Sequence, residues 1–430
     1  MALAQDAALM ETPAPSPIVV VGIGADGWDG LSRTSRTAIE RAEVVFGSSR
    51  QVAGVREHCA ATETWPSPLL PNLRPMIDAH AGSRVCVLAS GDPMFHGIGV
   101  TLVREFGAQR LRVHPAPSSV SLACARLGWA LQHTTTVSLV NSPVETMLPE
   151  LAEGRRILVL SQGSSTPGRI AAVLSANGFG ASGMTVLEQL GGPAERVASG
   201  IARESVFESV DPLNIVALEC VRDPDAARHS RIPGLADSAY IGDGQMTKQE
   251  IRALTLSALA PAPGELLWDI GGGSGTIAIE WMRTDSSCRA VTFESSRARR
   301  EQIESNAVRL GVPGLMVHGG APESFTTVSD EAAVPDAVFI GGGLTGSGML
   351  EACWDAVRAG GRVVANSVTA ESDSILVAAA AMYGGELRRF QIYRGEPLGA
   401  FTTWRPQLPV TQWCATKQWC ATKQWSATTR

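Results

Sequence analysis

Charged side chains are scarce in this sequence, and their balance is slightly acidic. They make up 18% of the 430 residues, and the formal net charge is −6. Proteins that bind nucleic acid usually present a broad basic surface, so this balance argues against a nucleic-acid partner. Lysine is rare, and arginine supplies most of the 36 basic residues. Because the arginine fork pairs with carboxylates and phosphates, a local site for a small polyanion remains compatible with the composition.

Cysteine pairs at metal-binding spacing are absent from the sequence. The eight cysteines are scattered, without C-x-x-C and without a histidine pair at zinc-ligand spacing. We therefore expect reduced, mostly buried thiols and no metal. The first 17 residues lack a basic n-region, and no apolar run approaches the ~18 residues of a membrane span. We expect a cytoplasmic protein without a membrane partner.

The chain is too long for one hydrophobic core, which favours at least two domains. Short β-branched runs alternate with helix-like segments through most of it, and this alternation predicts an α/β fold. A segment rich in Pro, Asp and Arg separates two such series. We predict a first domain over 17–221, a linker over 222–236, a second domain over 237–405 and a disordered tail over 406–430.

The tail is predicted from a repeat. QWCATK at residues 412–417 recurs at 418–423 and, imperfectly, as QWSATT at 424–429. Two copies and a remnant are too few to build a solenoid core. We interpret the repeat as an incidental extension, with a partner-binding, tryptophan-bearing peptide as the alternative.

The loop D-I-G-G-G-S-G-T, Asp269 to Thr276, follows a strand-like run and opens a helix-like one. Its glycines let a ligand approach the backbone, and the helix N-terminus offers unpaired N–H groups. Glu294 ends the next strand-like run, where a carboxylate can accept both hydroxyls of a ribose. Asp269 would repel a pyrophosphate but attract a cationic amino-acid or sulfonium group. The loop therefore favours S-adenosylmethionine over a dinucleotide.

An earlier loop, VVVGIGADG at residues 19–27, has the letters G-x-G-x-x-G without their usual context. Residues 28–31 separate its last glycine from the helix-like segment, and the next strand-like run ends without an acid. A nicotinamide or flavin cofactor is not predicted there. S-G-D-P at residues 90–93 follows a later strand-like run, and P-S-S at 117–119 follows another, placed to cap a helix.

These motifs resemble those of two families. The order G-x-G-x-G, S-G-D-P-x-F and P-x-[ST]-S is similar to the tetrapyrrole methylase family over about residues 18–219. MTKQEIR, DIGGGSGT, GGAPE and FIGGG resemble the precorrin methyltransferase and decarboxylase domains of cobalamin biosynthesis over residues 232–404. The resemblances imply a two-subdomain tetrapyrrole methylase fold followed by a doubly wound, Rossmann-like class I methyltransferase fold, each with its own S-adenosylmethionine site.

The resemblances also imply cofactor-binding residues, carried over motif by motif. In the first domain these are Gly22, Gly24, Ser90, Gly91, Asp92, Pro93, Phe95, Ser118 and Ser119. In the second domain they are Thr247, Asp269, Gly271, Gly272, Gly273, Ser274, Gly275, Glu294, Gly320 and Ala321. The sequence departs from the family patterns at Ala25, around Asn141, and at Gly320, where an aspartate is common.

The fused pair resembles the precorrin-6B C5,15-methyltransferase (decarboxylating) family. That resemblance implies methylation of a precorrin at carbon 5 by the first domain. It implies methylation at carbon 15 and loss of the ring C acetate carboxyl by the second, giving precorrin-8 in vitamin B12 biosynthesis. It also implies a homo-oligomer. Methyl transfer from a sulfonium to an enamine-like carbon requires no serine or cysteine nucleophile and no metal.

The substrate's carboxylates require cationic partners, and Lys248, Arg252 and Arg405 are the candidates, against the alternative of solvated surface charges. Glu323 and His96 are candidates for proton transfer, with helix capping as the alternative for Glu323. Other functions stay open: a methyltransferase for another tetrapyrrole, a two-domain NAD-dependent oxidoreductase, an RNA methyltransferase, or a non-catalytic precorrin carrier.

Overall fold

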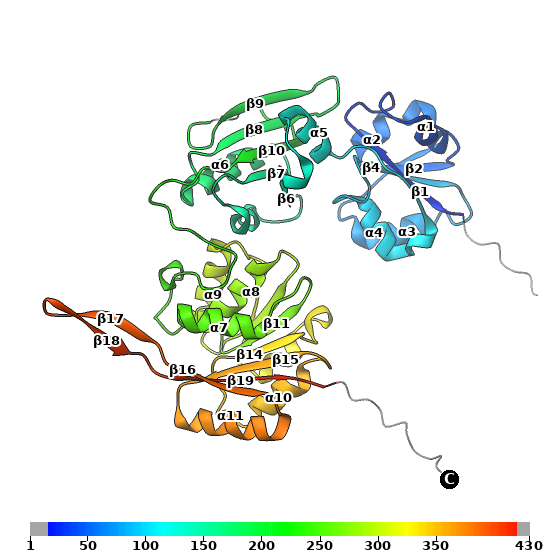
Figure 1. Cartoon of the computed structure of the whole chain (residues 1–430). Coiled ribbons are helices and arrows are strands. Elements are labelled where there is room, and N and C mark those ends of the chain that lie inside the picture. The colour runs from blue at the N-terminus through cyan, green and yellow to red at the C-terminus, as the bar shows by residue number, and fades with distance from the viewer. Residues whose placement is uncertain (1–15, 206, 208, 419–430) are drawn as a thin grey trace, which may run out of the picture. The chain divides into compact units, whose positions relative to one another are not determined.

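The computed structural model describes residues 16–205, 207 and 209–418 (Figure 1). The chain divides into two compact units. The first ends at Ala226 and the second begins at Ala227, and the short segment Glu145–Leu151 groups with the second unit. The division falls inside the range 222–236 that the sequence marks as a linker.

Two sheets form the first unit, and the first of them is parallel throughout. Among the described residues its strand order is β3-β2-β4-β1-β5, with β1 at Ile18–Ile23, β2 at Val44–Gly47, β3 at Thr62–Thr64, β4 at Val85–Ser90 and β5 at Leu111–His114. The continuous β-branched run of β1 suits a strand buried on both faces. Val21 packs with Ile39 of α1 on one face, and Val20 packs with Leu73 of α3 and Leu102 of α4 on the other. The helices are α1 (Arg33–Glu40), α2 (Ser49–Ala53), α3 (Leu70–Asp78) and α4 (Ile98–Phe106).

The second sheet of this unit is mixed. Its order is β6-β7-β10-β8-β9, with β6 at Thr135–Ser138, β7 at Arg156–Leu160, β8 at Gly183–Glu188, β9 at Arg196–Ile201 and β10 at Asn214–Glu219. Only β6 and β7 pair in parallel in this described sheet. Its helices are α5 (Ser119–Leu127) and α6 (Thr166–Ala176).

The second unit is built on one large sheet. In the described part of the chain its order is β13-β12-β11-β14-β15-β19-β16, with β11 at Leu266–Ile270, β12 at Arg289–Phe293, β13 at Met316–His318, β14 at Ala337–Ile340, β15 at Arg362–Ser367, β16 at Glu386–Phe390 and β19 at Val410–Thr416. The chain runs outward from β11 in both directions, so the strand order reverses between β11 and β14. Ligands of doubly wound sheets bind at the carboxyl ends of the strands at such a point.

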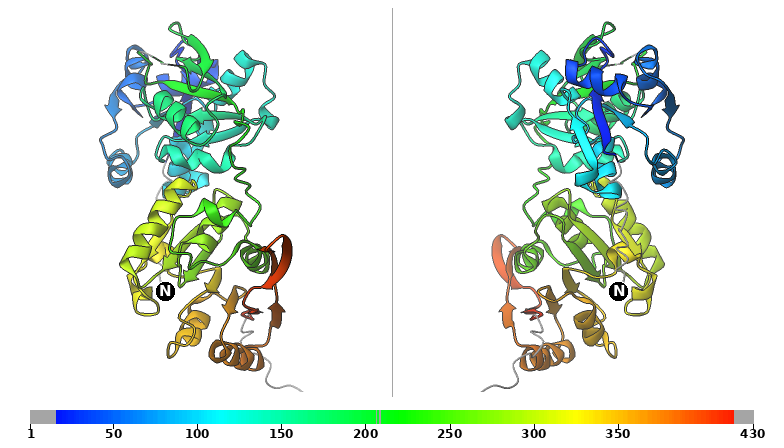
Figure 2. Two further views of the ribbon diagram at one scale, coloured as in Figure 1. Left: turned by 90° about the vertical axis from the view of Figure 1, so that its left-hand side faces the viewer. Right: turned by 90° about the vertical axis from the view of Figure 1, so that its right-hand side faces the viewer.

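Helices cover both faces of this sheet. Helices α7 (Gln249–Leu259), α8 (Thr276–Thr284) and α9 (Arg297–Arg309) pack on one face. Helices α10 (Met349–Ala356) and α11 (Ala370–Tyr383) pack on the other. A two-stranded hairpin, β17 (Tyr393–Leu398) with β18 (Phe401–Pro406), projects from the sheet between β16 and β19 (Figures 1 and 2). The α/β class predicted for both parts of the chain is confirmed.

Seven short 3-10 helices complete the described secondary structure. They are η1 (Arg56–His58), η2 (Ala108–Arg110), η3 (Leu131–His133), η4 (Val144–Glu150), η5 (Asp237–Ala239), η6 (Glu323–Thr327) and η7 (Asp330–Ala332).

The prediction of a disordered tail over 406–430 is wrong for Val410–Thr416. This segment contains most of the first QWCATK copy and forms β19, which pairs antiparallel with β15 and β16. Trp413 is fully buried, and its indole N–H donates to the Gly384 carbonyl at 2.9 Å. The repeat misled the prediction because a six-residue copy is long enough for one strand, and the strands that pair with this one are distant in the sequence. Residues 419–430 lie outside the described part of the chain.

We predict that Trp413→Ala lowers the free energy of unfolding of the second unit by about 3–5 kcal/mol, because it removes a large buried ring. Chemical denaturation followed by circular dichroism measures the effect. Met382→Ala, at an exposed position of α11 in the same unit, is the control and should change the value by less than about 0.5 kcal/mol. Equal effects of the two substitutions would contradict the burial of β19.

Candidate functional site

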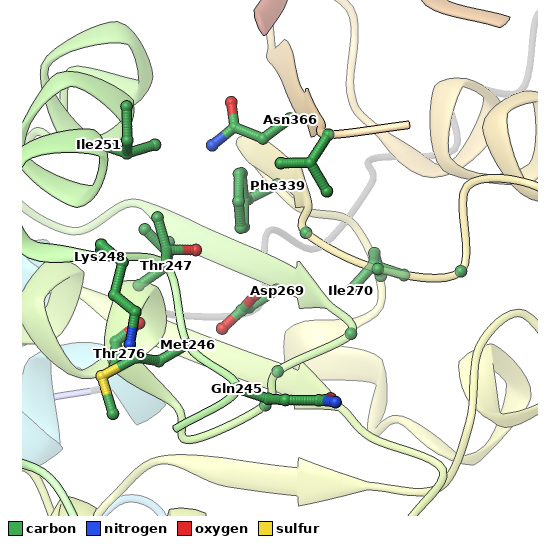
Figure 3. Close-up of a pocket in the computed structure, with 18 of the residues that line it drawn as sticks. Gln245, Met246, Thr247, Lys248, Ile251, Asp269, Ile270, Thr276, Phe339 and Asn366 are labelled. Carbon is green, nitrogen blue, oxygen red and sulfur yellow. The ribbon is translucent and has the colours of Figure 1, made fainter. Parts of the chain in front are cut away.

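A cavity of about 580 Å³ lies at the carboxyl ends of β11, β12 and β14 in the second unit (Figure 3). The segment before α7, the glycine loop after β11 and the loop after β14 supply much of its wall. It is lined by the predicted residues Thr247, Lys248, Asp269, Gly271, Gly272, Gly273, Glu294, Gly320 and Ala321. The motifs selected from separate parts of the sequence therefore meet in one place.

The glycine loop is shaped by the protein's own packing. Gly271, Gly273 and Gly275 have φ values of +75°, +57° and +78°, which L-residues with a side chain rarely adopt. A Cβ on Gly272 would lie 2.1 Å from Cγ2 of Thr292, and one on Gly271 would lie 2.7 Å from the Gly342 backbone. The loop thus fits closely between β12 and the loop after β14, which places its backbone along the cavity.

Glu294 links the end of β12 to the glycine loop. Its carboxylate accepts hydrogen bonds from the backbone N–H groups of Gly273 (3.0 Å) and Ser296 (2.9 Å). The side chain is only 5% exposed, yet it borders the cavity. A carboxylate held in this way is positioned before a ligand arrives, as the predicted ribose contact requires.

Asp269 is buried at the end of β11, with 1% exposure. Burial raises the pKa of its carboxyl to about 7, and the charge of Glu294 adds to this, while the Ala278 N–H donates at 3.3 Å and opposes the shift. A cation in the cavity would stabilise the ionised form and lower this pKa. A buried carboxylate that borders the cavity and gains from a cation fits the sulfonium and ammonium of S-adenosylmethionine.

Arg252 does not serve as the substrate clamp that the sequence suggested. Its side chain is fully buried and forms ion pairs with Glu280 (2.5 Å) and Asp237 (3.2 Å). One guanidinium nitrogen also donates to the Thr247 carbonyl at 2.7 Å. The pattern M-T-K-x-E-I-R marks the start of α7 but does not show which of its polar residues face inward. Arg252 therefore positions Thr247 and does not face a substrate.

The other predicted cations divide between the cavity and the surface. Lys248 lines the cavity, and its ammonium donates to the Gly244 carbonyl at 3.1 Å. Arg405 lies on exposed β18, where it pairs with Glu396 at 3.1 Å, and it is not a lining residue. Two arginines that the sequence did not suggest do line the cavity: Arg299 of α9 and Arg394 of β17. No sequence motif includes Arg299 or Arg394, because each borders the cavity only as a result of how its helix or strand packs in the fold.

Three further residues predicted for this site lie outside the cavity lining. Ser274 is buried, with its hydroxyl 3.5 Å from the Gln245 carbonyl. Gly275 is the N-cap of α8, and a Cβ there would lie 2.9 Å from Ile303. Both shape the loop. Glu323 is exposed in the first turn of η6, and no side-chain hydrogen bond caps that helix, so the structure does not bring it to the reacting centre.

Sequence reasoning missed an amide at the far side of the cavity. Asn366, at the end of β15, lines the cavity; its amide donates to the Thr255 hydroxyl (2.8 Å) and its carbonyl accepts from the Gln412 amide (3.0 Å). The Thr255 hydroxyl donates to the Ile251 carbonyl at 2.8 Å, so it must accept from Asn366, and this fixes the orientation of the Asn366 amide. Gln412 belongs to the first QWCATK copy, which was interpreted as tail.

In the first unit the three predicted segments also converge. A Cβ on Gly22 of β1 would lie 2.1 Å from the Gly91 carbonyl oxygen and 2.8 Å from the Ala116 nitrogen. Gly91 has φ +59°, and a Cβ there would lie 3.2 Å from Cα of Ser118. The carboxyl ends of β1, β4 and β5 therefore touch through small residues, and the S-G-D-P loop lies at this junction.

The side chains at this junction have distinct roles. Ser118 caps α5 by accepting from the Ser121 N–H at 3.1 Å. The Ser90 hydroxyl accepts from Arg50 (3.2 Å) and Gln51 (3.1 Å) of α2. The Asp92 carboxylate accepts from the Met94 N–H at 2.9 Å and shapes the turn.

Five predicted residues of this part of the first unit have other surroundings. Pro93 is buried, whereas Phe95 and His96 are exposed, with their rings edge to face at 4.9 Å. Ser119 is the first residue of α5. The three atoms nearest to a Cβ on Gly24 would all belong to Asp26, with Oδ1 at 2.5 Å, so its tightest contacts are within its own loop and not at the junction.

Family models match both parts of the chain. Residues 17–204 match the tetrapyrrole (corrin/porphyrin) methylases, and residues 238–417 match the precorrin methyltransferase domain. The precorrin-6Y C(5,15)-methyltransferase [decarboxylating] of Mycobacterium tuberculosis (strain ATCC 25618 / H37Rv) is 48% identical over 404 residues, which is 93% of this chain and 100% of the relative. The chain belongs to the precorrin-6Y C5,15-methyltransferase family.

Other relatives carry the same name. That of a Sinorhizobium species is 45% identical over 402 residues, covering 93% of this chain and 96% of the relative. The crystal structure of the C-terminal domain of precorrin-6Y C5,15-methyltransferase from Rhodobacter capsulatus is 41% identical, covers 44% of this chain and all of that domain, and has a TM-score of 0.41. The matches to the two family models confirm the two resemblances drawn from the sequence motifs, and the second match, over residues 238–417, includes β19.

Asp269 of this family member should make cofactor affinity depend on pH. Its carboxyl must be ionised to attract a cation, so affinity for S-adenosylmethionine should fall as the pH drops from 8.5 to 6, through the pKa of about 7. Isothermal titration measures this. Asp269→Asn should bind several-fold more weakly at pH 8.5 and lose this pH dependence. S-adenosylhomocysteine, which lacks the sulfonium charge, should show a smaller change in the unaltered protein.

The same substitution should stabilise the protein without ligand. Because the folded-state pKa lies above the ordinary value of 3.8, the contribution of Asp269 to stability is full below pH 3.8 and declines as the pH rises to about 7. Asp269→Asn should therefore raise the free energy of unfolding at pH 8 by roughly 1–3 kcal/mol. A loss of stability at pH 8 would contradict a net cost of burying this ionised carboxylate.

Gly272→Ala should destabilise the second unit by about 1–3 kcal/mol and weaken S-adenosylmethionine binding, because its Cβ would overlap Cγ2 of Thr292. Thr292→Ser removes that methyl group, so the double variant should regain most of the loss. A double-mutant cycle measured by chemical denaturation tests this. Additive effects of the two substitutions would show that the contact does not set the position of the loop.

Proposed function

We propose that this chain methylates a precorrin-6 substrate at carbons 5 and 15 with S-adenosylmethionine and decarboxylates the acetate of ring C, giving precorrin-8 in cobalamin biosynthesis. The substrate is precorrin-6B in our sequence-based prediction, and the relatives are named for precorrin-6Y. The observation that carries the proposal is the 48% identity to a relative of that name over its whole length. The cavity of the second unit supports it, because its lining fits the cofactor.

Each unit is proposed to hold one S-adenosylmethionine. In the first unit the S-G-D-P junction holds it for methylation at carbon 5. In the second unit the cavity holds it for methylation at carbon 15, and the same unit carries out the decarboxylation. Two family models of different type on the two halves of the chain support this division.

When bound, the cofactor supplies an electrophilic methyl group, so the chain's task is to orient the reactants and exclude water. Asp269 and Glu294 fix the cationic and ribose portions, and the glycine loop keeps side chains out of the space between them. Pre-alignment of this kind can lower a barrier by ~7–11 kcal/mol. Loss of carbon dioxide uses the conjugated imine system of the substrate as electron sink, in a site that removes water from the departing carboxylate.

Lys248 and Arg394 are proposed as the cationic partners of substrate carboxylates in the second unit. Both line the cavity, and Arg394 is oriented by an ion pair with Glu250 at 2.7 Å. Among the described lining residues none is a histidine. This favours a mechanism in which the substrate's own ring carries the electrons and no imidazole base takes part.

We also propose a homo-oligomer in which a second copy covers the β17–β18 hairpin. Phe401, Trp404 and Leu398 on this hairpin are 79%, 72% and 62% exposed. An isolated two-stranded hairpin is marginally stable in water, and large exposed apolar side chains mark contact surfaces.

The proposed setting is the cytoplasm, with no nucleic-acid partner. The seven cysteines of the described chain are free thiols, as is usual in a reducing compartment. The net charge of −6 disfavours nucleic acid. Within the described ranges, no helix has both the length and the apolar character needed to cross a bilayer.

The test is incubation of the full chain with precorrin-6B and methyl-labelled S-adenosylmethionine, followed by mass spectrometry. The unaltered protein should add two methyl groups and remove one carbon dioxide. Asp92→Ala in the first unit should abolish one methylation, and Glu294→Gln in the second should abolish the other. Arg297→Ala, at an exposed surface position on α9, is the control and should retain both. No methyl transfer by the unaltered protein would refute the proposal.

A further inference from the structure

A second cavity, of about 540 Å³, lies in the first unit at the amino ends of β1 and β4. The S-G-D-P loop follows the carboxyl end of β4, so the cavity and this loop lie at opposite ends of the parallel strands. Helix α1 forms one wall of the cavity and edge strand β5 forms the other. Neither the motifs nor the proposed reaction accounts for it.

The walls carry two rows of mostly basic side chains. The first row follows α1 and its C-cap at a spacing of four residues, with Arg33, then Thr37, then Arg41, so these side chains lie on one side of the helix. Arg112 and His114 alternate on β5 and therefore point to the same face of the sheet. We call these five residues, with Arg84 directly before β4, the basic groove.

The positive charge of the basic groove is largely uncompensated. Arg84 pairs with Glu43 at 3.0 Å, but Glu43 is not a lining residue, and no acidic side chain lines the described cavity. Within the described ranges, Arg33, Arg41 and Arg112 have no acidic partner. Arg33 also occupies the first turn of α1, where the helix dipole disfavours a cation. Burial and the nearby Arg112 lower the pKa of His114, so the charge comes from the arginines.

Between the two rows the cavity is apolar. Val19, Ala38, Ala42 and Val85 form its floor, and the Thr34 and Thr37 hydroxyls stand at its edge. Arginine forks at the rim match carboxylates in bidentate geometry, whereas the floor gains by covering an apolar surface. A small hydrophilic anion would bind to the arginines at the rim and leave the apolar floor exposed to water.

We propose that the basic groove is a binding site for an amphipathic polycarboxylate, meaning a molecule with an apolar body and several peripheral carboxylates. A carboxylated tetrapyrrole is one such molecule, and the groove is separate from the two methyl-transfer sites. The groove captures such a molecule from solution. The inference does not depend on which carbon the enzyme methylates.

The test uses coproporphyrin, which has four carboxylates on an apolar ring, as a fluorescent probe for the full chain. The methyl-transfer sites can also bind it, so the titration is repeated in a background that alters both of them, with Lys248→Ala/Arg394→Ala in the second unit and Asp92→Ala in the first, and in which the groove is intact. In that background Arg41→Ala/Arg112→Ala should weaken the remaining binding at least tenfold and reduce its dependence on salt. Arg297→Ala/Arg388→Ala removes two exposed arginines elsewhere and is the matched control.

Further measurements separate the proposal from general charge attraction. Tripolyphosphate, which lacks an apolar body, should bind at least tenfold more weakly than coproporphyrin. Arg41→Lys/Arg112→Lys keeps the charge without the forks and should bind less tightly than the unaltered groove. Unchanged thermal unfolding confirms that the variants are folded. Equal losses in the groove and control variants, or equal affinity for the two probes, would overturn the proposal. Failure of the precorrin assay alone would leave it standing.

Discussion

The buried carboxylate of Glu280 is the contact on which the second unit's site depends. At 2% exposure it accepts from the backbone N–H groups of Gly234 (2.5 Å) and Leu235 (3.1 Å), the Tyr240 hydroxyl (2.8 Å) and the Arg252 guanidinium (2.5 Å). These donors come from the segment that enters the domain and from α7, whereas Glu280 lies on α8. Removing one partner of such a pair would leave a buried charge, at a cost of about 3–5 kcal/mol. The ion pair therefore holds α7, which Thr247 precedes, against the helix that the glycine loop opens.

In both units, glycines at the carboxyl ends of the strands allow loops to pack closely together, although the two sheets differ. In the first unit a Cβ on Gly22 would lie 2.1 Å from the Gly91 carbonyl oxygen, and in the second a Cβ on Gly271 would lie 2.7 Å from the Gly342 backbone. Gly22 lies on β1 and Gly271 directly follows β11, and in each case the glycine lets the loop after a neighbouring strand come close. The glycines are needed first for contact between loops of the protein. Access of a ligand to the backbone follows from that contact.

The motifs predicted this part of the structure well because their chemistry is local. A strand followed by glycines and a helix specifies its own turn, and Glu294 follows its strand directly, so sequence order alone places both at one sheet edge. The errors came where position depends on distant pairing. Arg252 is charged, so it was predicted to bind substrate at the surface. Its side chain instead faces inward, because it pairs with Glu280, which lies on a different helix. The β19 segment was predicted to be part of the tail because it contains the first copy of the repeat, whereas its partners, β15 and β16, lie well before the repeat in the sequence.

This difference explains why the motifs predicted the glycine-loop side of the cavity better than the opposite side. The glycine-loop side includes the loops that follow β11, β12 and β14. Asn366, Arg394, Gln407 and Val410 on the other side come from β15, the hairpin, the segment after it and β19. Their arrangement depends on the antiparallel insertion of β19 between β15 and β16, which turns the base of the hairpin toward the cavity. A change of substrate can therefore arise in the hairpin and β19 while the glycine loop stays the same. Gln412 illustrates this dependence on distant pairing. It belongs to the apparent repeat, yet its amide donates to the carbonyl of Asn366, which borders the cavity.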